Sequence, residues 1–303
     1  MEQINKTNDI DDDINISQII EVFLEKKVLV VSVTLFFAIF SVIYALSLPN
    51  IYTSKSLLAP TAVEDSLSTQ LSSYSSIANL AGVSLLRESA TKSAEAIARM
   101  QSYEFFSEFI VPSIGLENII AVKEWDSLNN KIIYDKNLYD VNTGKWVDDT
   151  KTSQQKAFEV FLSIFSLSVD RETSFVNISI QHKSPFMAKK LLETIIFNIN
   201  ESMRSQDIRL AEASINYLNE SKNLTQLQSL QEGISNLLEN QMQTLMLASS
   251  NESYVFKVID SPIAPERKSG PVRSIICIVI TMIGGFLSLI AAYFQHLRES
   301  KNI

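Results

Sequence analysis

The chain has 303 residues, with 26 lysines and arginines against 34 aspartates and glutamates, so its formal net charge is −8. This acidic balance argues against a nucleic-acid-binding protein. The hydrophobic share of 46%, with only seven glycines and seven prolines, excludes a disordered or collagen-like chain.

The first predicted element follows an acidic leader, residues 1–27, which contains three consecutive aspartates at positions 11–13. Residues 28–48 then form an apolar run of 21 residues without a charge. As a helix this run is about 31 Å long, close to the ~30 Å hydrocarbon core of a bilayer. A signal peptide would have a short basic leader and a shorter apolar core. We therefore predict a retained membrane anchor, rather than a signal peptide or a buried core helix.

Residues 49–273 are predicted to form one α+β domain. The expected elements, in chain order, are a strand at 51–59, a loop with short helical pieces at 61–84, a helix at 93–110 that Pro112 ends, a turn-rich excursion at 121–149 with short strands around 131–134, a helix at 153–165, a hairpin of 166–171 with 175–182, and a last strand at 254–259.

The longest helical pattern begins after Ser184, a favoured N-cap residue, with Pro185 at the first helical position. It predicts a helix over residues 185–222, roughly 57 Å long. A return helix over residues 225–248, capped by Asn223, completes an antiparallel helical hairpin.

An apolar stripe repeats along the long helix at three- and four-residue steps. It includes Leu191, Leu192, Ile195, Ile196 and Ile199. A helix of this length favours packing of the stripe against other copies of the chain, which predicts a homo-oligomer. The alternative is that the helix kinks between residues 200 and 206 and folds back on its own domain.

A second uncharged run of 21 residues, 274–294, predicts a second membrane-spanning helix, followed by a tail of residues 295–303. Two spans place both termini on one side of the membrane. Lys26 and Lys27 before the first span favour an N-terminus in the cytoplasm, whereas Arg267, Lys268 and Arg273 before the second span favour the reverse. The first span usually dominates, so we expect cytoplasmic termini and an external domain.

The sequence lacks the usual signs of catalysis. It has no phosphate-binding glycine loop, no nucleophile elbow and no zinc-protease histidine pair. The single cysteine, Cys277, excludes an internal disulfide framework and lies inside a predicted span, and His182 is expected at a strand end on the surface. We predict a protein that is not an enzyme and that has no metal site and no cofactor.

A proline-rich motif precedes the second span: Pro262, Pro265 and Pro271, with Arg273 at the membrane edge. The motif resembles the signature of bacterial chain-length determinant proteins, the Wzz-type polysaccharide co-polymerases. Gly270 departs from that signature, which often has serine there. Residues 77–84 also resemble the small-residue segment that follows the first strand in this family. Prolines lack an N–H and fix φ, so they favour a stiff, extended connector.

Small residues in both spans predict faces for close helix packing. The second span carries Gly284, Gly285 and Ser288, and the first carries Ser41 and Ala45. The alternative is that these residues contact only lipid.

The resemblance implies a ring-like homo-oligomer in the bacterial inner membrane, with both termini in the cytoplasm and the main domain in the periplasm. It also implies a function. Such a protein sets how many repeat units a partner polymerase adds to a lipid-linked glycan, typically the O-antigen of lipopolysaccharide. The alternatives are an envelope scaffold or sensor without a glycan role, and an accessory subunit of a polysaccharide exporter.

Overall fold

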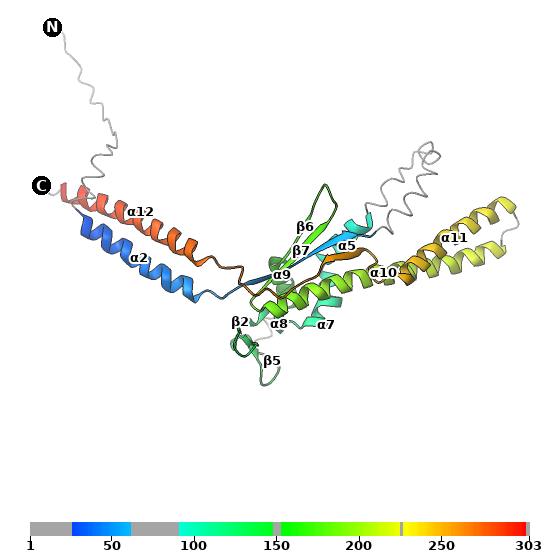
Figure 1. The fold of residues 1–303 in the computed structure, drawn as a ribbon, viewed down its shortest axis with the longest axis horizontal. Helices are drawn as coiled ribbons and strands as arrows, with labels where there is room; N and C mark the ends of the chain where they lie inside the picture. Colours follow the sequence, from blue (N-terminus) through cyan, green and yellow to red (C-terminus); the bar gives the residue numbers. More distant parts are fainter. Residues whose placement is uncertain (1–25, 62–90, 148–152, 225–226, 301–303) are drawn as a thin grey trace, which may run out of the picture. The chain divides into compact units, whose positions relative to one another are not determined.

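The computed structural model describes residues 26–61, 91–147, 153–224 and 227–300 (Figure 1). The chain divides into two compact units. One unit comprises Met1–Pro49 with Gly270–Ile303, and the other comprises Asn50–Ser269. The predictions for the aspartates at 11–13 and for residues 77–84 lie outside the described residues.

The first unit contains two apolar helices that pack side by side, α2 (Lys27–Ser47) and α12 (Arg273–Ser300). Within the described residues, these are the two helices that are long and apolar enough to cross a membrane. Only 17% of each apolar window is buried. A core helix of a soluble domain would bury far more of its apolar surface, so this exposure fits spans better than core helices.

A four-stranded antiparallel sheet organises the second unit, in the order β6-β7-β1-β8. Its strands are β1 (Tyr52–Pro60), β6 (Phe165–Val169), β7 (Val176–His182) and β8 (Phe256–Asp260). Strand β1 pairs with β7 in a register that sets Ser56 opposite Ile178. The predicted strands and hairpin are therefore present, with boundaries shifted by one or two residues.

One face of this sheet is covered, because burial alternates along β7: Val176, Ile178 and Ile180 are buried while Asn177 and Gln181 are exposed. The helix α10 (Pro185–Leu224) packs on β1 and β7 at this face. Phenylalanines from the helices around it fill the rest of the core, namely Phe105, Phe106 and Phe161.

The helical segment before the excursion is less regular than its sequence predicts. It runs as α5 (Thr91–Met100), α6 (Tyr103–Phe105), a π-helical turn η2 (Phe106–Ile110), α7 (Val111–Ile114) and α8 (Glu117–Ile120).

The structure differs from the predicted helix over residues 93–110 in two ways. Ser102 interrupts it, because its Oγ accepts a hydrogen bond from Phe105 N at 3.2 Å and so starts a new helix. Pro112 does not end the helical segment, because it lies in the first turn of α7, where a missing N–H costs nothing. The helix α7 ends instead at Gly115, whose φ of 86° suits glycine, and α8 follows after it.

The excursion forms two small hairpins, β2 (Val122–Asp126) with β3 (Lys131–Tyr134), and β4 (Tyr139–Asp140) with β5 (Lys145–Trp146). The helix α9 (Gln154–Ile164) follows, and Ser153 caps it by accepting a hydrogen bond from Lys156 N at 3.2 Å. The strands near 131–134 and the helix at 153–165 are thus found where the sequence predicts them.

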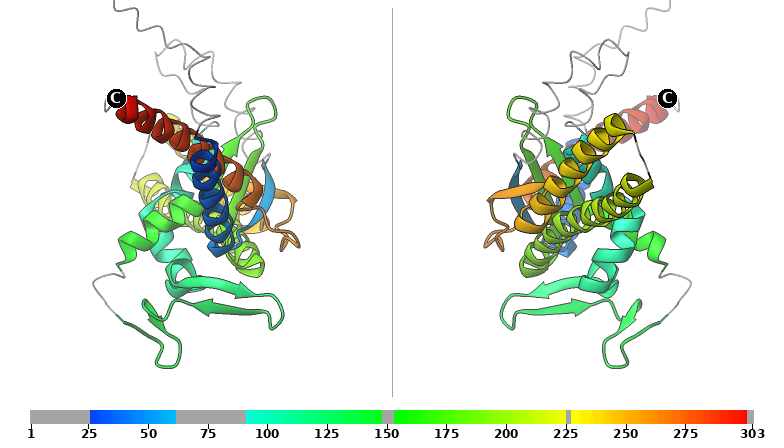
Figure 2. Two further views of the ribbon diagram at one scale, coloured as in Figure 1. Left: turned by 90° about the vertical axis from the view of Figure 1, so that its left-hand side faces the viewer. Right: turned by 90° about the vertical axis from the view of Figure 1, so that its right-hand side faces the viewer.

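The long helix α10 has 40 residues and is continuous from Pro185 to Leu224, so it has no break between residues 200 and 206. It pairs with α11 (Gln228–Ser250) to form the predicted helical hairpin, whose two helices run side by side in Figures 1 and 2. Asn223 does not cap the second helix, because α10 extends through it and α11 begins after Leu227.

Candidate functional site: the paired apolar helices, the proline-rich connector and a polar cavity

The small residues of the second apolar helix face the first. At Gly284, an added Cβ would collide with the Cβ and Cγ atoms of Phe37. At Gly285 the nearest such neighbour is the Thr34 hydroxyl at 4.0 Å, so the space there is open. Ser288 is fully buried, and its Oγ lies 3.4 Å from Thr34 Oγ1. Close approach of α2 and α12 therefore depends on Gly284 more than on Gly285.

The small residues of the first helix are buried in the same contact. Ser41 and Ala45 are each 1% exposed. The Ser41 hydroxyl donates to Ala38 O at 2.7 Å, so its polarity is satisfied within its own helix, and Cys277 Sγ lies 3.8 Å from Ser41 O. The structure thus brings Gly284, Ser288, Ser41 and Ala45 into one helix–helix contact within the chain, and Gly285 lies at its edge.

The proline-rich connector follows β8 and runs along β1. Ser54 Oγ donates to Ile263 O at 2.8 Å, and Ser56 Oγ donates to Asp260 O at 2.6 Å. Pro262 is buried between these contacts, whereas Pro265 is half-buried. Side chains of β1 therefore hold the end of β8 through the Asp260 carbonyl and the connector through the Ile263 carbonyl.

The segment that follows α2 and the segment that precedes α12 are hydrogen-bonded to each other at two places. Within the domain, Ser269 N donates to Ile51 O at 2.8 Å. Within the helix pair, Arg273 Nη2 donates to Leu48 O at 3.1 Å. Pro271, which lies between Ser269 and Arg273 in the sequence, is half-buried. Arg273 therefore ties the start of the second apolar helix to the end of the first.

The stripe on the long helix has a different role from the one predicted for it. Leu191, Leu192, Ile195, Ile196 and Ile199 are all buried in the core of their own domain. The assignment of these five side chains to contacts between copies is therefore wrong. The sheet and the helices of the same chain cover them, and they have no free surface for another copy.

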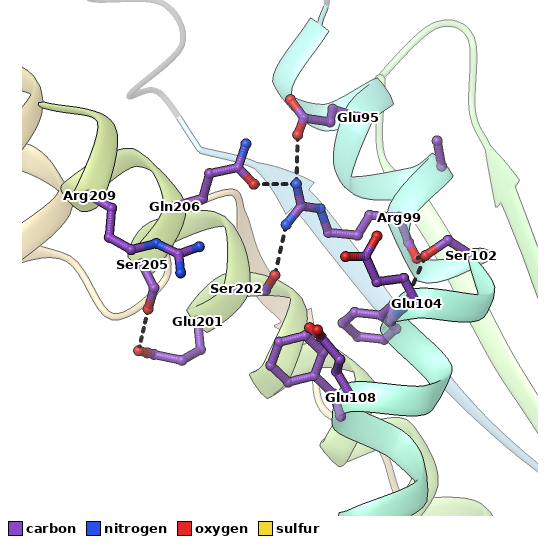
Figure 3. Close-up of a pocket in the computed structure, with 13 residues that line it drawn as sticks. Glu95, Arg99, Ser102, Glu104, Glu108, Glu201, Ser202, Ser205, Gln206 and Arg209 are labelled. Atoms are coloured by element: carbon purple, nitrogen blue, oxygen red, sulfur yellow. Dashed lines mark hydrogen bonds and ion pairs between the residues drawn. The ribbon is translucent and has the colours of Figure 1, made fainter. Parts of the chain in front are cut away.

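A polar cavity of about 700 Å³ lies between the α5–η2 segment and α10 (Figure 3). Arg99 crosses it: Nη1 donates to Ser202 Oγ at 2.9 Å, and Nη2 donates to Glu95 Oε1 at 2.9 Å and to Gln206 Oε1. Further charged side chains line the cavity, namely Glu104, Glu108, Glu201 and Arg209.

The sequence analysis did not find this cavity. The available signal was the Glu95–Arg99 spacing of four residues on a helix, which also describes an ordinary surface ion pair. The cavity offers hydrogen-bond donors and acceptors in a mixed-charge setting. Within the described residues, no group of three or more histidine, cysteine or carboxylate side chains is placed to hold a metal ion.

A second polar cluster joins α5 to α10 and to the residues before β8. Asp207 Oδ2 accepts from Lys92 Nζ at 2.6 Å and from Tyr254 OH at 2.5 Å. Burial, together with the Asp207 carboxylate, raises the pKa of the Tyr254 hydroxyl. The tyrosine therefore stays protonated and acts as a hydrogen-bond donor.

His182 lies in the interior, so the expectation of a surface residue is wrong. Its Nδ1 accepts from Ser184 N at 2.9 Å, and its Nε2 lies 2.8 Å from Asn118 O. Because a carbonyl only accepts, Nε2 carries the proton and the ring is neutral. Burial lowers the pKa of this imidazole, although the backbone carbonyls of Asn118 and Ser184 act in the opposite direction.

These observations define a class of protein: an α+β domain with a long helical hairpin, preceded and followed by helices of membrane-spanning length. Residues 12–111 match the family model described as chain length determinant protein. The match confirms, over those residues, the resemblance that the sequence analysis based on the proline-rich motif. The motif itself lies outside the matched residues. A search of curated proteins finds no match.

Two solved structures are similar to this chain. One is a full-length bacterial polysaccharide co-polymerase, with 11% identity, coverage of 93% of this chain and 98% of that chain, and a TM-score of 0.41. The other is a fragment of WzzB, a polysaccharide co-polymerase from Salmonella Typhimurium, with 12% identity, coverage of 73% and 100%, and a TM-score of 0.31. These TM-scores are too low to support a conclusion about function.

Proposed function

We propose that this protein regulates the chain length of a lipid-linked surface polysaccharide, with the O-antigen of lipopolysaccharide as the first candidate. The observation that carries the proposal is the match of residues 12–111 to chain length determinant proteins. The two helices of membrane-spanning length on either side of one domain support it. In this proposal the protein is not an enzyme. It acts by modulating a membrane-bound polymerase, and it contacts the lipid-linked glycan either directly or through that partner.

Deletion of the gene, followed by gel display of the surface polysaccharide, tests this function. We expect the loss of a preferred length and its return when the gene is supplied again. Loss of all surface polymer would favour the accessory subunit of an exporter. An unchanged length distribution would contradict the proposal and favour a scaffold or sensor.

The proposal includes a two-pass topology in the bacterial inner membrane, with cytoplasmic termini and the domain of residues 49–273 in the periplasm. Alkaline phosphatase is active only outside the cytoplasm. A fusion after Asn251 should therefore be active, and a fusion after Ile303 should be inactive. The reverse result would overturn the orientation without affecting the two spans.

The proposal also includes assembly into a homo-oligomer. Since the stripe beginning at Leu191 is buried, the surface for assembly has to be another one. The exposed apolar residues Phe197, Leu210 and Tyr217 on α10 are available. Protein purified in mild detergent should behave as a large oligomer in light scattering, and a monomer in several detergents would contradict assembly.

A further inference from the structure

The excursion of residues 121–147 carries both tryptophans of the chain, Trp125 and Trp146. The Trp125 ring lies 5.5 Å from the Tyr52 ring and 5.9 Å from the Phe186 ring. The Trp146 ring lies 5.1 Å from the Tyr139 ring. Both indoles are half-buried, so each has an apolar body against the protein and a side that faces outwards.

The excursion is attached firmly to the domain. Lys183 Nζ donates to Val122 O at 2.5 Å, and Tyr134 OH donates to Asn118 Oδ1 at 2.7 Å. The buried His182 ring bonds the backbone of the same Asn118. Both hairpins extend from one side of the domain, away from the four-stranded sheet (Figure 2). These contacts hold the hairpin of β2 with β3, and Trp125 with it, in a fixed position on the domain.

Each hairpin presents an apolar side chain at its turn. Leu128 is 94% exposed and Val141 is 60% exposed. An aspartate fixes each turn: Asp126 Oδ1 accepts from Leu128 N at 2.9 Å, and Asp140 Oδ1 accepts from Asn142 N at 2.9 Å. One exposed apolar residue is ordinary on a protein surface. Here each of the two hairpins combines one such residue at its turn with a tryptophan on its strands.

Covalent connection keeps this surface near the proposed membrane. Tyr52 comes five residues after Ser47, the last residue of α2. Five residues reach at most about 18 Å when fully extended. Because Trp125 contacts Tyr52, the excursion is close to the chain position that leaves the bilayer. The polar headgroup layer extends roughly 5–8 Å beyond the hydrocarbon core on each side of the bilayer. This thickness is smaller than the reach of the five connecting residues, so the headgroup layer is within reach of the excursion.

The charges of the described part of the excursion balance one another. Residues 121–147 contain four lysines and four acidic residues, and two further acidic residues, Asp148 and Asp149, follow them in the sequence. Tryptophan and tyrosine favour the membrane–water interface, where one side of the ring is apolar and the other is wet.

We infer that the excursion of residues 121–147 docks on the surface of the lipid bilayer, with Trp125 and Trp146 at the headgroup level and Leu128 and Val141 towards the acyl chains. The inference rests on the proposed function only in that α2 and α12 span the membrane. Docking would hold the domain at a fixed height and tilt above the bilayer, beyond what the two short connections can impose.

The two tryptophans make the test direct, because their fluorescence reports only on the excursion. The full chain is reconstituted in phosphatidylcholine vesicles with and without bromine on the acyl chains, since bromine quenches indoles that lie nearby. We expect loss of tryptophan emission in the brominated vesicles, and weaker quenching by aqueous iodide than in detergent. Trp125→Phe and Trp146→Phe variants assign the loss to each ring.

A double variant, Leu128→Asp with Val141→Asp, should reduce the quenching by brominated lipid while leaving the circular dichroism spectrum unchanged. Leu230→Asp is the matched control. Leu230 is 53% exposed in the first turn of α11, where a carboxylate is tolerated, and it lies on the helical hairpin rather than on the excursion. This control should retain full quenching.

The outcomes separate docking from membrane anchorage. If the protein stays with the vesicles after an alkaline carbonate wash but brominated lipid does not quench either tryptophan, docking is overturned and the spans stand. If the protein is washed off the vesicles, both the spans and docking are overturned. If the aspartate double variant is quenched as strongly as the original chain, the hairpin turns do not contact lipid and the inference fails.

Discussion

Gly284 of α12 lies directly against Phe37 of α2, so closely that the structure has no room for a side chain at position 284. Its neighbour in the sequence, Gly285, has only the Thr34 hydroxyl within 4.0 Å. Two adjacent glycines in one apolar helix therefore have different surroundings. Only the first is required by the contact between the two helices.

The pair Gly284→Ala and Gly285→Ala should separate packing from helix propensity. Each substitution favours the helix by about 1 kcal/mol and adds one methyl group. Gly284→Ala should nevertheless push α2 and α12 apart and shift the preferred polysaccharide length, whereas Gly285→Ala should be neutral. Cys277, the single cysteine, is half-buried beside Ser41, so its rate of labelling by a thiol reagent should rise in the first variant only.

Equal labelling rates and equal length distributions in the two variants would show that the tight contact at Gly284 has no role in holding the helices together. Replacing both glycines by leucine together would be less informative, because that double substitution fills an open position and a closed one at the same time. The alanine pair has the same change in volume and hydrophobicity at both positions, so a difference between them has a steric cause.

The sequence predicts elements whose signal is local. The two apolar helices, the hairpin of β6 with β7 and the long helix all follow from uninterrupted patterns of apolar residues. The role of the stripe that begins at Leu191 could not be predicted in this way. A periodic pattern identifies an apolar face, but not whether the same chain or another copy covers it.

Polar contacts in the interior are even harder to predict from the sequence than the role of this stripe. Nothing near His182 in the sequence indicates that Asn118, 64 residues earlier, supplies its partner. The cavity around Arg99 likewise combines residues that are over 100 positions apart. Sites made by contacts between distant segments need the fold, whereas the proline-rich connector is continuous and could be found directly.

Asn200 should be one of the most sensitive positions in the domain. It is buried, and its Oδ1 accepts from Val255 N at 2.8 Å and from Phe256 N at 2.9 Å, while Nδ2 donates to Phe256 O at 3.1 Å. Asn200→Ala leaves two buried N–H groups without an acceptor, and each costs about 1–3 kcal/mol. We expect the free energy of unfolding, measured by urea titration of the full chain, to fall by about 2–5 kcal/mol.

Asn198→Ala is the control for this change, because it lies on the same helix and removes a single hydrogen bond to Thr194 O. Both substitutions replace asparagine with alanine on the same helix, so they raise its helix propensity equally. The difference between their free energies of unfolding therefore measures the attachment of β8 to α10. If the two variants are equally stable, the Asn200 side chain does not hold the strand.

Arg99 should stabilise the contact between α5 and α10. Hydrogen bonds that involve a charged group contribute about 1.5–3 kcal/mol, and Arg99 makes two of them across the cavity, to Ser202 and Gln206. Arg99→Ala should therefore lower the free energy of unfolding by about 1–3 kcal/mol and speed hydrogen exchange in α5. Lysine should restore little of this, since it cannot reproduce the planar fork of donors.

Arg204 provides the comparison, since it pairs with Glu201 at 2.5 Å on its own helix and crosses to no other element through that bond. Pairs of this kind contribute only about 0.3–0.5 kcal/mol. Arg204→Ala should leave hydrogen exchange in α5 unchanged. Equal effects of the two substitutions would assign the loss to the general removal of a positive charge.

His182 should make the stability of the domain depend on pH near neutrality. Burial lowers the pKa of its imidazole in the folded protein below the unfolded value of about 6.5. As pH falls below about 6.5, the unfolded chain takes up a proton that the folded chain does not. Stability is therefore complete above this pH and decreases below it, by at most about 1.4 kcal/mol per pH unit.

The variant His182→Gln removes this titration while an amide N–H can still reach Asn118 O. It should be less stable than the original chain at pH 7, because the acceptor for Ser184 N is altered, and that bond lies at the start of α10. Between pH 7 and pH 5, however, its free energy of unfolding should fall less steeply. The difference between the two urea-unfolding curves isolates the histidine, because the carboxylates titrate in both proteins. Parallel curves would mean that the ring accepts a proton in the folded state, in which case Nδ1 cannot be the acceptor for Ser184 N.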